Sequence, residues 1–121
     1  MAERRLIAIV DDDPSMLSGI RRLLNANGFA TEVYDSAEAF LKRSADTKPH
    51  SLVLDIHLGG MSGFGLRERL QSIGSALPVI FITADDDQAT HNLAIQAGCV
   101  ACLRKPFSAK QLLEAIERRA D

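Results

Sequence analysis

Five short apolar runs recur along the chain, with polar and helical stretches between them. Three of these runs are continuous and rich in branched side chains: Leu6–Val10, Leu52–Ile56 and Val79–Thr83. Continuous runs of this length are typical of strands that are buried on both faces of a parallel sheet. Two weaker candidates of similar length are Thr31–Tyr34 and Val100–Leu103. The hydrophobic pattern therefore predicts five strands.

Apolar residues at helical spacing follow each predicted strand. Pro14 suits the first position of the first helix, and Gly28 stands where the C-terminal cap of that helix belongs. Ser108 is a suitable N-cap for the last helix. The three helices between them are predicted over Ser36–Ser44, Gly63–Ser72 and Asp87–Ala97. Strands that alternate with helices predict an α/β fold, in which a doubly wound parallel sheet carries helices on both faces.

Length and composition fit a single domain that spans residues 1–121. The chain is 46% hydrophobic and 25% charged, and it has no apolar stretch of about 18 residues that could cross a membrane. The apolar run near the N-terminus is too short for a signal peptide, so we expect a cytoplasmic protein. The net charge is −2 and the basic residues are dispersed, which argues against direct binding of nucleic acid.

Polar and charged side chains stand where four of the five predicted strands end. The first strand runs into Asp11–Asp13, the third ends with Asp55, the fourth ends with Thr83, and the fifth runs into Arg104–Pro106. The carboxyl ends of parallel strands lie at one edge of a sheet, where open α/β folds bind their ligands. We therefore expect these side chains to lie close together, except that Asp13 is expected to serve only as the N-cap of the first helix.

Three carboxylates that converge at this edge, those of Asp11, Asp12 and Asp55, would repel one another. Their repulsion would raise a pKa or attract a cation, and hard oxygen ligands suit Mg²⁺. Together with a magnesium ion, the Lys105 ammonium would balance the three negative charges. A carboxylate beside Mg²⁺ and a lysine can attack a phosphoryl group, whose equatorial oxygens the metal, the ammonium and the Thr83 hydroxyl would then stabilise.

The segments that carry these residues resemble the receiver domains of bacterial response regulators, the CheY-like family, and are most similar to its FixJ type. The matching segments are IVDDDPSML (Ile9–Leu17), LVLDIHLGGMSG (Leu52–Gly63), VIFITA (Val79–Ala84) and LRKPF (Leu103–Phe107). The match extends from about Leu6 to Arg119. The resemblance implies a flavodoxin-like (βα)5 fold with strand order 2-1-3-4-5, and a part in two-component signal transduction as a phosphoprotein of a phosphorelay.

The resemblance also implies a phosphoryl acceptor and its metal. Asp55 would accept a phosphoryl group from a sensor histidine kinase or a phosphotransfer protein, in a reaction that requires Mg²⁺ or, in its place, Mn²⁺. Asp12, Asp55 and the backbone carbonyl of His57 would ligate the metal, and Asp11 would act through a bound water. The domain would promote only its own phosphorylation and dephosphorylation, so no enzyme activity on other substrates is expected.

Roles beside the acceptor and at the surface follow from the same resemblance. Thr83 would hydrogen-bond the phosphoryl group, Lys105 would pair with it, and the peptide bond between Lys105 and Pro106 would be cis. The kinase would select the domain through the first helix, around Pro14, Met16 and Leu17. The fourth helix, the fifth strand and the fifth helix would form the output surface, which would bind a downstream protein or a second copy of the domain.

Several positions set this chain apart within the family pattern. Gly59 stands where the family usually has proline, and with Gly60 it should loosen the loop after the acceptor. Cys102 stands where the family often has tyrosine or phenylalanine, and a cysteine has no large ring to turn inward on activation. His57 and Asp85 are expected to flank the mouth of the site. They either tune the lifetime of the phosphoryl group, by admitting or orienting water, or are exposed loop residues without a role.

A pair of cysteines suggests other chemistry. Cys99 and Cys102 form a C-x-x-C pair, which can indicate redox activity or half of a zinc site. The pair enters a strand instead of leading into a helix, and if Cys99 already belongs to that strand the two sulfurs lie on opposite faces. The histidines show no ligand spacing. Structural thiols are therefore the favoured interpretation, and the absence of glycine-rich phosphate motifs argues against nucleotide binding.

Two alternatives to a phosphorylation switch stay open. One is a phosphohydrolase of the haloacid dehalogenase type, a family that carries a D-x-D motif. Asp55-Ile56-His57 lacks the second aspartate of that motif. A receiver-like interaction module that works without phosphorylation would be compatible with Cys102 and Gly59, whereas the complete set of acids, Thr83 and Lys105 argues against it. The sequence ends just after the fifth predicted helix, so a stand-alone regulator and a fragment of a longer one are both expected forms.

Overall fold

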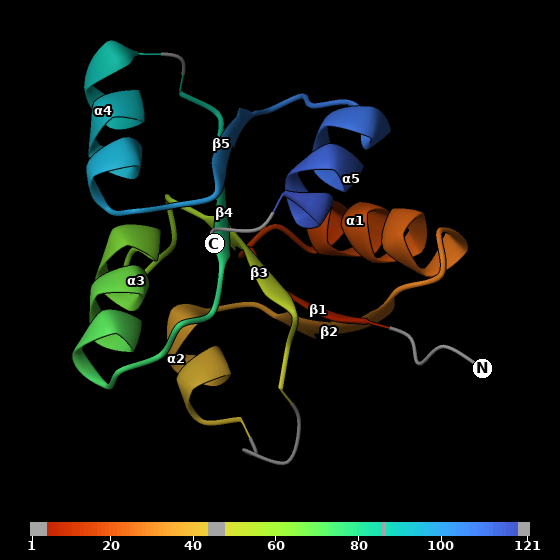
Figure 1. Cartoon of the computed structure of the whole chain (residues 1–121), viewed down its shortest axis with the longest axis horizontal. Coiled ribbons are helices and arrows are strands. Elements are labelled where there is room, and N and C mark those ends of the chain that lie inside the picture. Colours follow the sequence, from red (N-terminus) through yellow and green to blue (C-terminus); the bar gives the residue numbers. More distant parts are fainter. Residues whose placement is uncertain (1–4, 44–47, 86, 119–121) are drawn as a thin grey trace.

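Strands and helices alternate along the computed structural model, which describes residues 5–43, 48–85 and 87–118. The strands are β1 (Leu6–Val10), β2 (Ala30–Tyr34), β3 (Ser51–Asp55), β4 (Val79–Thr83) and β5 (Ala101–Arg104). The helices are α1 (Pro14–Ala26), α2 (Ala37–Leu41), α3 (Gly63–Ser72), α4 (Gln88–Gln96) and α5 (Ala109–Glu117). The strands form one parallel sheet in the order β2-β1-β3-β4-β5, which confirms the predicted fold and strand order (Figure 1).

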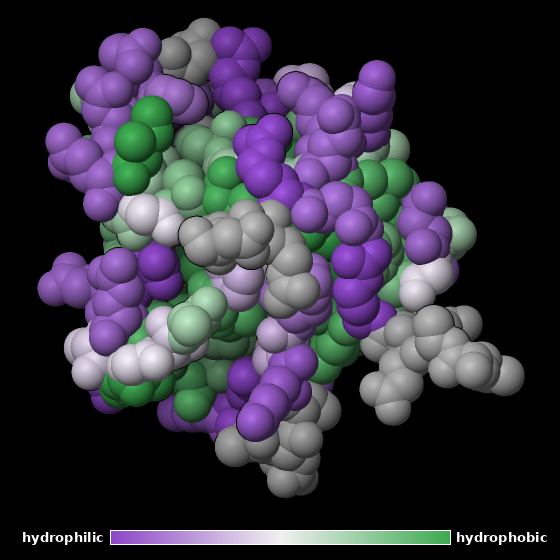
Figure 2. Space-filling model, in the orientation of Figure 1, coloured by the Kyte–Doolittle hydropathy of each residue, from purple (hydrophilic) through white to green (hydrophobic). Residues whose placement is uncertain are grey.

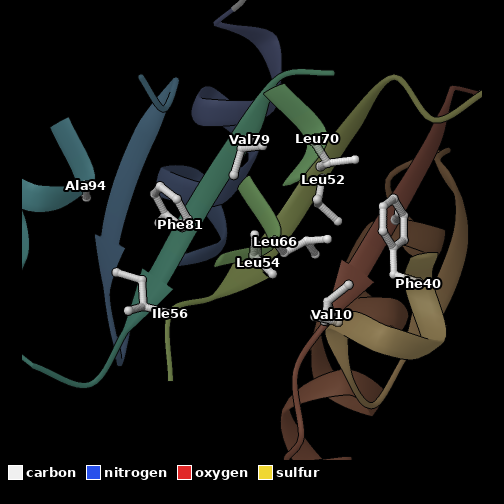
Figure 3. Close-up of a cluster of buried hydrophobic side chains, with 12 residues drawn as sticks. Val10, Phe40, Leu52, Leu54, Ile56, Leu66, Leu70, Val79, Phe81 and Ala94 are labelled. Carbon is white, nitrogen blue, oxygen red and sulfur yellow. The ribbon is translucent and has the colours of Figure 1, made fainter. Parts of the chain in front are cut away.

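The hydrophobic core has two halves, one on each face of the sheet. Along β1, Ala8 and Val10 point to one face and Ile7 and Ile9 point to the other, as the two-residue period of a strand requires. Helices α2, α3 and α4 cover the first face, and α1 and α5 cover the second (Figure 1). Figure 3 shows the first half of the core, where side chains of β3 and β4 meet those of the covering helices. The central strands are thus buried on both faces, which explains their continuous apolar runs.

Side-chain caps set where the helices begin. The N-cap residues are Asp13, Ser36, Ser62, Asp87 and Ser108, and the side chain of each accepts a hydrogen bond from the first turn. This confirms the predicted capping roles of Asp13 and Ser108. After α1, Gly28 adopts a φ of +89°, a conformation that favours glycine. Helix α2 ends at Leu41, before the predicted end at Ser44, and Ser44 lies outside the described residues.

Most of the visible surface is hydrophilic, with a few exposed hydrophobic side chains (Figure 2). The described residues include two large exposed hydrophobic side chains on α4, where Leu93 is 52% exposed and Ile95 is 59% exposed. A third, Ile73, follows α3 and is 64% exposed. Across the described parts of the chain, no helix combines the length and the apolar character that a membrane span requires.

Candidate functional site

The carboxyl edge of the sheet brings the predicted site residues together. Asp55 is the last residue of β3 and Thr83 is the last residue of β4, while Asp11 directly follows β1 and Lys105 directly follows β5. Strands β1, β3 and β4 lie side by side in the sheet, so the residues at their ends become neighbours. Asp11, Asp55 and Thr83 are polar but only 0%, 5% and 3% exposed. Buried polar groups of this kind require partners, and the next elements supply them.

Lys105 is the positive partner of two of the carboxylates. Its Nζ lies 3.1 Å from Asp11 Oδ2 and 3.1 Å from Asp55 Oδ2, and its side chain is 18% exposed. Burial by itself lowers the pKa of Lys105, but the hydrogen bonds to the two carboxylates outweigh it, and the net pKa is raised. The ammonium therefore stays charged over the whole physiological pH range. The peptide bond from Lys105 to Pro106 is cis, as predicted.

The three predicted carboxylates form a compact cluster. Asp11, Asp12 and Asp55 can each offer one oxygen, and these oxygens all lie within 4.8 Å of one another. The pKa of Asp11 is raised, mainly by burial and further by the charge of Asp55, although the Asp13 backbone N–H and Lys105 oppose the shift. Three carboxylates against one ammonium leave two net negative charges. An all-oxygen site with that charge fits a hard divalent cation such as Mg²⁺.

Backbone N–H groups fix the orientation of the two buried carboxylates. The N–H of Asp13 donates to Asp11 Oδ1 at 2.9 Å, and the N–H of His57 donates to Asp55 Oδ1 at 3.0 Å. Since Lys105 takes the Oδ2 atom of each carboxylate, both oxygens of Asp55 have a donor. The Asp55 side chain is thus held in one orientation, as a preorganised reacting group would be.

His57 and Asp85 form a bridge across the mouth of the site. Nε2 of His57 lies 2.7 Å from Asp85 Oδ2, although both side chains are about half exposed. The backbone of each bridge residue also contacts the site. The N–H of Asp85 donates to Thr83 Oγ1 at 3.0 Å, and the N–H of His57 donates to Asp55. The predicted position of this pair at the mouth agrees with the structure, and its role in the phosphoryl lifetime stays a prediction.

The two cysteines behave as parts of the core. Cys99 precedes β5 instead of lying within it, and both Cys99 and Cys102 pack against the hydrophobic cluster on the first face of the sheet. Burial raises the pKa of both thiols, which is opposite to the shift of a redox-active cysteine. Among the described residues, the aspartate cluster is the one group of three side chains positioned to bind a metal. These observations favour structural thiols over a redox pair or a zinc site.

Cys102 lies beside a cavity next to the site. A cavity of about 310 Å³ lies between the end of β4, the start of α4 and β5. Its lining residues are Thr83, Asp85, Asp87, Gln88, His91, Cys102 and Arg104. Because Thr83 and Cys102 share this cavity, a movement of Thr83 has space next to it and no ring to displace.

Two positions of the site were not identified from the sequence. A Cβ on Gly63, the first residue of α3, would lie 2.4 Å from the carbonyl oxygen of Asp55, so only glycine lets α3 approach the end of β3 this closely. The only indication of Gly63 in the sequence is that it falls within a segment that resembles the receiver family. Glu38 on α2 contacts the loop after β3 through a hydrogen bond to the Met61 N–H. No spacing or motif in the sequence indicates that contact.

Comparison with known proteins agrees with this geometry. The chain matches the response regulator receiver domain over residues 7–117. It is 36% identical over 115 residues to the transcriptional regulatory protein FixJ of Rhizobium meliloti, covering 95% of this chain and 56% of that protein. It is 34% identical over 111 residues to the response regulator protein TodT of Pseudomonas putida, covering 92% and 49%. The crystal structure of FixJ-N superposes with a TM-score of 0.88 at 35% identity, covering 97% of this chain and 94% of that one.

The parallel sheet with its acidic carboxyl edge defines the class of the protein, a CheY-like receiver fold. The chain belongs to the response regulator receiver domain family. Receiver domains are signalling domains of two-component systems, and the aspartate cluster of this chain suits their Mg²⁺ site. The chain spans about half the length of the curated relatives it matches.

Proposed function

We propose that this domain accepts a phosphoryl group on Asp55 from the phosphohistidine of a sensor histidine kinase or a phosphotransfer protein. The observation that carries the proposal is the environment of Asp55. Its carboxylate is almost fully buried at the end of β3, accepts hydrogen bonds from Lys105 and the His57 N–H, and lies in a cluster with Asp11 and Asp12. A structural aspartate at a strand end would not require this convergence of three separate segments.

In the proposed reaction a carboxylate oxygen of Asp55 attacks the phosphorus atom. A P–O bond forms to Asp55 as the P–N bond breaks, and the partner's imidazole leaves with the electron pair of that bond. Lys105 offsets the charge of the transferring group, and the Thr83 hydroxyl donates to one of its oxygens. Mg²⁺, held by Asp12, Asp55 and the His57 carbonyl with Asp11 behind a water, would supply further positive charge.

The phosphoryl donor would dock beside the acceptor, on α1. A shallow apolar hollow of about 180 Å³ lies there, between α1 and the segment after β5. It is lined by Met16, Gly19, Ile20, Leu23, Pro106 and Phe107. The hollow is next to Lys105, so a kinase helix seated on it would present its phosphohistidine to the acidic edge. An apolar surface next to the charged edge suits a transient contact with a helix of the kinase.

The output would be read on the surface of α4, β5 and α5. Leu93 and Ile95 are large apolar side chains exposed on α4, and Cys102 on β5 lines the cavity that reaches Thr83. We propose that a downstream protein or a second copy of the domain binds here. Movement of Thr83 toward a phosphoryl group would change the cavity behind this surface, and Cys102 would transmit less of that change than an aromatic ring.

Incubation of the domain with acetyl phosphate and Mg²⁺ is expected to add one phosphoryl group. The reaction is expected to stop when a chelator removes the metal, because the buried carboxylates then repel the incoming anion. Intact-protein mass spectrometry of samples with and without chelator measures both outcomes. Uptake that is independent of the metal would contradict the proposed mechanism, and no uptake at any metal concentration would favour an interaction module that works without phosphorylation.

Breaking the bridge between His57 and Asp85 is expected to shorten the lifetime of the phosphoryl group several-fold. The contact between the two side chains spans the mouth of the site, so its loss gives water a path to the phosphorus. The variants Asp85→Ala and His57→Ala remove the same contact, and their double variant should therefore decay no faster than either one. The decay of the phosphorylated mass after removal of the phosphodonor measures the lifetime. Unchanged lifetimes in both single variants would show that these are exposed loop residues without a role.

A further inference from the structure

The loop that follows β3 is attached on both sides of Gly60. The N–H of Gly59 donates to Oδ2 of Asp12 at 3.3 Å, and the N–H of Met61 donates to Oε2 of Glu38 at 3.0 Å. The two acceptors come from distant parts of the chain, because Asp12 follows β1 and Glu38 lies on α2. The sequence predicts a loose loop at Gly59 and Gly60, whereas the structure holds it between two carboxylates.

Gly60 itself fits closely against Glu38. Its φ is +76°, and a Cβ there would lie 2.8 Å from Glu38 Oε2, so the carboxylate occupies the space that any larger residue would need. The hydrogen bond from the Met61 N–H is the main cause that lowers the pKa of Glu38, so the contact favours the charged form of this carboxylate. Glu38 and the left-handed Gly60 therefore fix where Gly59 lies.

We propose that Glu38 and the N–H of Gly59 are positioning elements for Asp12, and that together they set the Mg²⁺ affinity of the domain. This inference rests on the metal site of the proposed function. Asp12 is exposed, so packing does not hold its side chain. A hydrogen bond to Oδ2 holds the carboxylate in place and leaves its other oxygen for the cation. Outer partners that orient a ligand in this way typically change metal affinity by about 10–100-fold.

Gly59 offers a matched pair of variants. Proline at this position would remove the donated N–H, whereas alanine would keep it. A Cβ on Gly59 meets nothing within 4 Å, and its φ is outside the left-handed range, so alanine should fit without strain. We therefore expect Gly59→Pro to lower the Mg²⁺ affinity about tenfold or more, and Gly59→Ala to leave it nearly unchanged.

Glu38 offers a second pair that separates hydrogen bonding from charge. Glu38→Gln keeps an oxygen that can accept the Met61 N–H but removes the negative charge, and Glu38→Ala removes both. If position and not charge is what counts, Glu38→Gln should bind Mg²⁺ nearly as the wild type does. Glu38→Ala should bind it several-fold more weakly. Glu68→Ala, on the exposed side of α3, controls for the loss of a glutamate elsewhere.

Isothermal titration with MgCl₂ measures the affinity of each variant without any phosphodonor, and far-ultraviolet circular dichroism confirms that each is folded. The proposal is overturned if Gly59→Pro binds Mg²⁺ as the wild type does, or if Gly59→Ala loses as much affinity as Gly59→Pro. If Gly59→Pro does not fold, the two Glu38 variants decide, and equal affinities in both would reject the positioning role of Glu38. A wild-type chain that binds no Mg²⁺ would overturn the metal site itself, a result distinct from a wild type that binds while its variants do not differ.

Discussion

Replacement of Asp55 by asparagine is expected to abolish uptake of the phosphoryl group and to leave the domain folded. Asparagine has nearly the shape of aspartate and keeps an oxygen for the His57 N–H, but an amide is not a nucleophile toward phosphorus. The change also removes one buried negative charge from a cluster that has an excess of them. Incubation with acetyl phosphate and Mg²⁺, followed by intact-protein mass spectrometry, measures the loss directly.

Asp13→Asn is the matched control for this experiment. Asp13 stands at the same edge of the sheet, but its carboxylate accepts the N–H of Ser15 as the N-cap of α1. Asparagine is an equally good N-cap, so both phosphoryl uptake and stability should be retained. Stoichiometric uptake by Asp55→Asn would place the acceptor on another residue and contradict the assignment of Asp55.

The pattern of the sequence predicted the fold because burial leaves a simple signature. Strands β1 and β4 are buried on both faces, and their continuous apolar runs predicted their bounds as the structure has them, Leu6–Val10 and Val79–Thr83. Strand β3 is equally buried, but its predicted bounds, Leu52–Ile56, lie one residue beyond the observed Ser51–Asp55. Edge strands give a weaker signal, and the predicted bounds of β5 lie one residue too early. The residues at the strand ends were predictable too, since parallel strands must bring them to one edge.

The contacts made by loops could not be predicted in the same way. The distance between His57 and Asp85 depends on the course of two loops, as does the approach of Glu38 to Met61, and neither has a periodic pattern. The identity of a residue can even suggest that a loop is more mobile than the structure shows. Gly59 and Gly60 predicted looseness from their backbone freedom, but the missing side chain of Gly60 also allows Glu38 to approach and hold this loop.

Replacement of Lys105 by methionine is expected to lower the free energy of unfolding by about 3 kcal/mol at neutral pH without Mg²⁺. Methionine keeps the apolar stem but leaves Asp11 and Asp55 as buried like charges without a cation. Removing one partner of a buried ion pair costs more than the pair itself contributes, because the other charge stays desolvated. Urea unfolding of both proteins in metal-free buffer measures the difference.

The dependence of this loss on pH and metal tests its cause. Burial raises the folded-state pKa of Asp11 above the ordinary value of 3.8, so the contribution of this group to stability is greatest below that value and is lost as pH rises through the folded pKa. Lys105 opposes this rise in pKa, so in Lys105→Met the folded pKa of Asp11 should be higher still. The two proteins should therefore differ least in acid and increasingly as the pH approaches neutrality. Saturating Mg²⁺ should raise the stability of Lys105→Met toward that of the metal-free wild type, since a ligand at 100 times its Kd contributes about 2.7 kcal/mol.

Lys110→Met controls for the loss of a lysine, because Lys110 lies on the exposed face of α5. It should change the free energy of unfolding by no more than about 0.5 kcal/mol, as is usual at surface positions. A deficit in Lys105→Met that is the same at acidic and neutral pH would show that lost packing causes it. Such a result would remove the argument that the two carboxylates require a cation. A deficit that disappears in acid and in Mg²⁺ would show that lysine and metal serve the same buried charges, which is the condition for a site that binds a divalent ion and then an anionic phosphoryl group.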